Sequence, residues 1–144
     1  MTMPTVHVDV PYEPHPDLRR QLFEDLGTVP EIVASSRSVE DLPAYVLIST
    51  FLGQFVTALA GQFGADAAGR LGRALGRLRT GGGEPGREIR ISCASSGVIA
   101  VLTERAALDD RAMRELLGLD FTAFRRGTEL HWDADARRWR TSRR

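Results

Sequence analysis

The chain opens with alternating apolar and polar residues. In "TVHVDV", three valines alternate with His7 and Asp9, which is the two-residue period of a half-buried strand. The following "HPDLRRQLFEDLG" spaces its leucines four apart and ends in glycine, so it predicts a short amphipathic helix. "TVPEIVASS" predicts a second strand, which its proline confines to a sheet edge or a strand start. We therefore predict a strand, a helix and a strand within residues 1–36.

An uncharged run covers residues 42–65, although 26% of the chain is charged. Ser38 and Asp41 precede it with the spacing of a helix capping box, so we predict that the run is one long helix. Its large apolar residues follow the i, i+3, i+4, i+7 spacing and predict a stripe that faces the core. This core stripe contains Ile48, Phe51, Leu52, Phe55, Val56, Leu59 and Phe63.

Small residues occupy the opposite face of this predicted helix. They recur every four positions, at Ser49, Gly53, Thr57 and Gly61, and we call them the small-residue row. Such spacing lets a second helix approach closely, both in membranes and in tightly packed soluble helical hairpins. The row is therefore predicted to be a helix-packing interface.

A second helix is predicted from "AAGRLGRALGRLR", after a glycine and an aspartate that supply a break and a new N-cap. Arg70, Arg73 and Arg77 share one edge of this helix, where they form either a solvated face or a contact for an anion or acidic partner. The helical segment thus covers residues 37–79. The stretch "TGGGEPG", residues 80–86, predicts a linker, because its glycines and proline sustain neither helix nor strand.

Residues 87–144 predict a strand hairpin, a helix and a second strand hairpin. "REIRISC" and "VIAVLTE" flank a short turn, and Asp109 is placed to cap the helix "DDRAMRELLG". In the last hairpin, Leu130, Trp132 and Trp139 are predicted to share one face. The whole chain is therefore predicted to be one α+β domain, a mixed β-sheet packed by the long apolar helix and the Gly/Arg-rich second helix.

Composition narrows the classes of function. The formal net charge is zero, so no bulk attraction to nucleic acid or anionic lipid is predicted. Trp132 and Trp139 near C-terminal arginines are explained better by a core or an interface than by base stacking. The single cysteine, Cys93, excludes an intramolecular disulfide and fits a reducing cytoplasm. The N-terminus lacks the pattern of a cleaved signal, and no cofactor or metal is predicted.

No group of residues predicts a catalytic site. Cys93 would need a base beside it to act as a nucleophile, and no local motif places His7, His15 or His131 there. Paired carboxylates are explained by helix capping and turn formation. These pairs are Asp109 with Asp110, and Asp133 with Asp135.

The order of the predicted elements suggests a family. A strand and helix, then "SVEDLPAYVLISTFLGQFV", a Gly/Ala/Arg-rich segment and a strand hairpin resemble the effector-associated constant components of bacterial conflict systems. These small proteins are thought to accompany variable effectors such as proteases or signalling domains. The resemblance covers residues 5–104 and implies a non-enzymatic adaptor in bacterial defence, with no catalytic residue carried over.

These observations predict a cytoplasmic, non-enzymatic assembly or adaptor protein. It would act through helix-mediated self-association, as a homo-oligomer, or through binding of a partner protein. Two alternatives stay open. One is a membrane-associated component that uses the uncharged helix over residues 42–65, which has the length of a membrane span. The other is a small hydrolase that uses Cys93 or a carboxylate pair together with His131.

Overall fold

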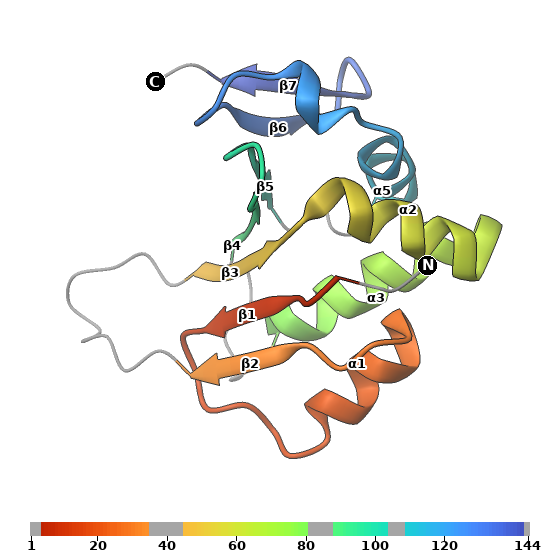
Figure 1. Ribbon diagram of the computed structural model, residues 1–144, viewed down its shortest axis with the longest axis vertical. Coiled ribbons are helices and arrows are strands. Elements are labelled where there is room, and N and C mark those ends of the chain that lie inside the picture. Colours follow the sequence, from red (N-terminus) through yellow and green to blue (C-terminus); the bar gives the residue numbers. More distant parts are fainter. Residues whose placement is uncertain (1–3, 35–44, 81–87, 104–108, 143–144) are drawn as a thin grey trace.

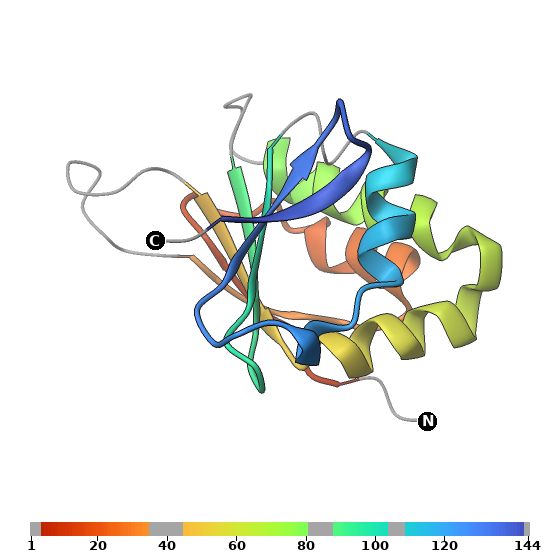
Figure 2. The same cartoon turned by 90° about the horizontal axis from the view of Figure 1, so that it is seen from above.

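A computed structural model describes residues 4–34, 45–80, 88–103 and 109–142. They form a seven-stranded mixed sheet in the order β2-β1-β3-β4-β5-β6-β7, with the α-helices gathered on one of its faces (Figures 1 and 2). In chain order the elements are β1 (His7–Val10), α1 (Leu18–Leu26), β2 (Glu31–Ala34), β3 (Tyr45–Thr50), α2 (Leu52–Phe63), the 3-10 helix η1 (Gly64–Asp66), α3 (Ala67–Thr80), β4 (Glu88–Cys93), β5 (Ile99–Leu102), α5 (Asp110–Leu117), the 3-10 helix η3 (Phe121–Ala123), β6 (Glu129–Asp133) and β7 (Arg138–Ser142).

The first three elements confirm the predicted strand, helix and strand. β1 and β2 are parallel neighbours, and α1 is the crossover that connects them. The leucines of α1 are buried against the sheet, as their spacing predicts. Gly27 ends the helix with a left-handed φ of 73°, and its N–H donates to the carbonyl of Phe23. β2 is an edge strand, in agreement with the position of Pro30 directly before it.

The prediction of one helix across residues 42–65 is wrong, because residues 45–50 form strand β3. Val46, Ile48 and Thr50 are buried, and the residues between them are half-buried, which is the period of a strand. Ile48 also fits the predicted helical stripe, because a short apolar segment is compatible with both the 3.6-residue period of a helix and the two-residue period of a strand. The proposed cap at positions 38 and 41 lies outside the described residues. The apolar helix begins only at Leu52.

The glycine-rich second helix is confirmed as α3. A break at η1 separates it from α2, as the glycine and aspartate predict. α3 packs against α1 on one side and α5 on the other, and its leucines and alanines face the core. Thr80 is the last residue of α3, and the rest of the predicted linker lies outside the described residues.

The C-terminal half also follows the prediction. β4 and β5 form an antiparallel pair, and the carboxylate of Asp109 caps α5 by accepting from the N–H groups of Arg111 and Ala112. In the last hairpin, Trp132 lies opposite Trp139, with ring centroids 5.6 Å apart in an edge-to-face arrangement. The indole of Trp139 donates to the carbonyl of Ala112 over 3.0 Å, so the hairpin is fastened to α5.

The helices leave the other face of the sheet uncovered (Figure 2). Along the strands, the deeply buried side chains such as Val46 and Ile89 alternate with less buried ones, because successive side chains point to opposite faces. One row across the uncovered face follows from the pairing register. It contains Asp9, Leu47, Arg90, Val101 and His131.

Replacing Gly27 by alanine should lower the free energy of unfolding by about 1–2 kcal/mol, since a side chain is strained at positive φ. The new Cβ would also lie 2.5 Å from Nε2 of Gln62, which must move. Gly118→Ala is the matched control: it follows α5 with φ −94°, and a Cβ there has its nearest neighbours at 3.7 Å. Denaturant titration of both variants checks this, and equal losses would contradict it.

Candidate functional site

The small-residue row is divided between two elements. Ser49 belongs to β3 and is half-buried, whereas Gly53, Thr57 and Gly61 lie on α2 and are exposed. The hydroxyl of Thr57 donates to the carbonyl of Gly53 over 2.8 Å. A Cβ built at Gly53 or Gly61 meets nothing within 4 Å in the described chain. The outer side of α2 is therefore flat and accessible, and Ser49 is not part of that surface.

Five of the seven residues of the predicted core stripe are buried, Ile48 on β3 and the other four on α2. Leu52, Phe55, Val56 and Leu59 are at most 5% exposed and pack between α2 and the sheet. Phe63, at the end of α2, is partly buried. Phe51 stands just before the helix and is 48% exposed, because the chain turns from β3 into α2 at this residue.

The arginine row of α3 joins this helix to α1. Asp25 of α1 is only 5% exposed, and its carboxylate lies 2.7 Å from Nε of Arg77 and 3.7 Å from Nε of Arg73. Arg70 donates to the carbonyl of Glu24 over 2.7 Å, and its guanidinium lies 4.0 Å from the ring centroid of Phe63. These arginines therefore have partners inside the chain. A contact with an acidic partner stays a prediction, with the Arg73 side chain still 61% exposed.

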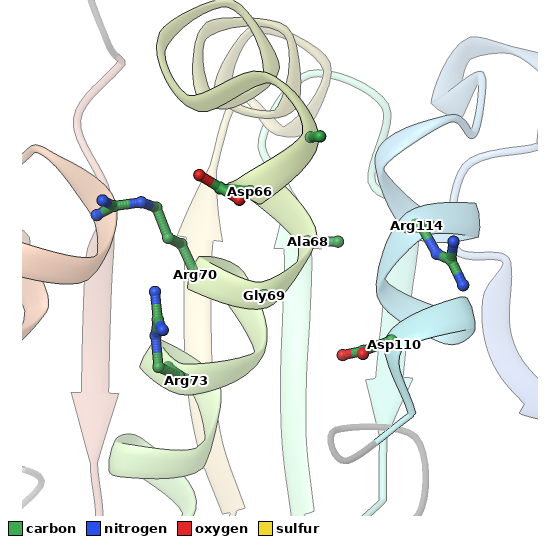
Figure 3. A pocket seen from close by; sticks show the side chains of 8 residues that line it. Asp66, Ala68, Gly69, Arg70, Arg73, Asp110 and Arg114 are labelled. Carbon is green, nitrogen blue, oxygen red and sulfur yellow. The ribbon is translucent and has the colours of Figure 1, made fainter.

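An open depression of about 460 Å³ lies between α3 and α5. Its wall contains Asp66, Arg70, Arg73, Asp110 and Arg114, among other residues. In Figure 3 the guanidinium of Arg70 extends toward α1, whereas the side chain of Arg114 points away from α3. The charged groups therefore do not converge on a common point, and the depression lacks the geometry of an anion site.

Cys93 ends β4, beside the first residue of α2, and is 2% exposed. Its Sγ lies 3.4 Å from Oγ of Ser95. Burial raises the pKa of this thiol, but hydrogen bonds from Ser95, Ser96 and the backbone of Leu52 act in the opposite direction and lower it to about 6. The arrangement favours a thiolate in a closed site.

Cys93 and His131 do not meet. Cys93 belongs to the buried row that faces the helices, whereas His131 lies opposite Val101 and Arg140 on the uncovered face.

The paired carboxylates act as caps and turn residues, as predicted. Asp109 caps α5 and accepts from the indole of Trp132 over 3.2 Å. Asp133 accepts from the N–H groups of the last hairpin turn, and these bonds lower its pKa. No described arrangement therefore supports the hydrolase alternative.

In the part of the chain that the structure describes, no helix combines the length and hydropathy that crossing a membrane requires. Across the same residues, no three His, Cys, Asp or Glu side chains are grouped to hold a metal ion. No protein family, curated protein or solved structure matches this chain significantly.

Sequence reasoning missed Asp25 as the residue that orders the arginine row. The spacing within α1 predicts that Asp25 is buried, because it follows Leu22 by three residues and therefore lies on the apolar side of the helix. An acidic residue on an apolar helical stripe implies a charged partner nearby. The partner itself is 52 positions away in the sequence, so the pattern within α1 does not identify it.

Asp25→Ala should lower the free energy of unfolding by about 2–3 kcal/mol, because a buried carboxylate that pairs with Arg77 is lost. The neighbouring Glu24→Ala is the control. It removes an exposed pair with Arg20 at 3.0 Å and should cost less than about 0.5 kcal/mol. Urea unfolding of both variants measures the difference. Similar losses in the free energy of unfolding would show that the buried pair stabilises the fold no more than the exposed pair.

The lowered pKa of Cys93 makes stability depend on pH. A folded-state pKa near 6, below the ordinary 9.0, means that the thiolate favours the folded protein. This contribution is complete above pH 9.0 and is lost as the pH falls through 6. The stability of the wild type relative to Cys93→Ala should therefore rise between these two pH values. Denaturant titrations across the range measure it, and a pH-independent difference would contradict the assignment.

Proposed function

We propose that this protein is a non-enzymatic assembly or adaptor module whose helix α2 binds a helix of another copy or of a partner protein. The observation that carries the proposal is the exposed outer side of α2. There Gly53, Thr57 and Gly61 leave the helix backbone open to close approach. We call these three residues the α2 face.

The cost of glycine supports this reading. Each glycine inside an exposed helix lowers helix stability by about 1 kcal/mol relative to alanine. Packing inside a chain often offsets such a cost, but the described residues leave the space around Gly53 and Gly61 open. A second helix on the α2 face would make use of both positions, since small residues four or eight apart let two helix backbones approach.

The resemblance to effector-associated constant components favours the same role. Proteins of that kind are expected to hold other proteins together rather than to catalyse a reaction. For this chain, a place in a bacterial defence system is accordingly part of the proposal. The buried side of α2 packs against the sheet, so a partner would bind this helix on the α2 face.

The double variant Gly53→Leu, Gly61→Leu should separate assembly from folding. Two leucines would block close approach and reduce the mass of the assembly, while the melting temperature should rise, because leucine favours helix over glycine by nearly 1 kcal/mol per site. Light scattering measures the mass, and circular dichroism measures the melting temperature.

The matched control is Gly69→Leu, Gly76→Leu. These glycines lie on α3, and a Cβ at either one also meets nothing within 4 Å in the described chain. The control should leave the mass unchanged. A wild-type protein that is monomeric at every concentration and retains no partner would overturn the proposal, and so would an assembly that tolerates leucine at both α2 positions.

A further inference from the structure

We draw no further inference here: the strongest candidate, the uncovered face of the sheet around Leu47, Arg90 and Val101, carries none because nothing in the described part of the chain shows what covers it.

Discussion

The pairing of β3 with strands on both sides holds this molecule together. β3 is antiparallel to β1 and parallel to β4, so it is the only link in the described sheet between the N-terminal β1-α1-β2 unit and the remaining strands. Val46 and Ile48 face the helices from this position, and they share their layer with Ile89 and Ile91 of the neighbouring strand. α1, α3 and α5 lie side by side on the face where these central strands present their most deeply buried apolar side chains (Figure 2).

Much of the fold follows from sequence periodicity, and the failures share one physical cause. α1, α3, α5 and both hairpins have caps, glycines and apolar spacing that are set by neighbours close in the chain. β3 lacks such local signals, and its identity depends on pairing with β1 and β4, which lie far away in the sequence. The same reason explains Asp25, whose partner comes from a different helix. Periodicity placed Gly53 opposite the stripe that faces the core, but only the packed structure shows that no other described element covers this residue.

The two longest helices, α2 and α3, differ in the residues on their outer sides. On α3, Arg77 donates to the buried carboxylate of Asp25 and Arg70 donates to the carbonyl of Glu24, so these two arginines bind α1. On α2, the uncharged outer side makes no packing contact at Gly53 and Gly61. Gly69 and Gly76 of α3 are equally open in the described chain, so α2 differs from α3 in that its outer side carries no charge, whereas arginines join α3 to α1.

The position of the two tryptophans has a practical consequence. They are the only tryptophans in the chain, and both lie in the β6–β7 hairpin, where their indoles donate to Asp109 and Ala112 at α5. The intrinsic fluorescence of this protein is thus a local signal of hairpin docking on that helix. It does not report on the opposite border of the sheet, whereas far-ultraviolet circular dichroism sums over the helices and strands of the whole chain. The two signals therefore give the same transition only when the hairpin and the rest of the molecule unfold together.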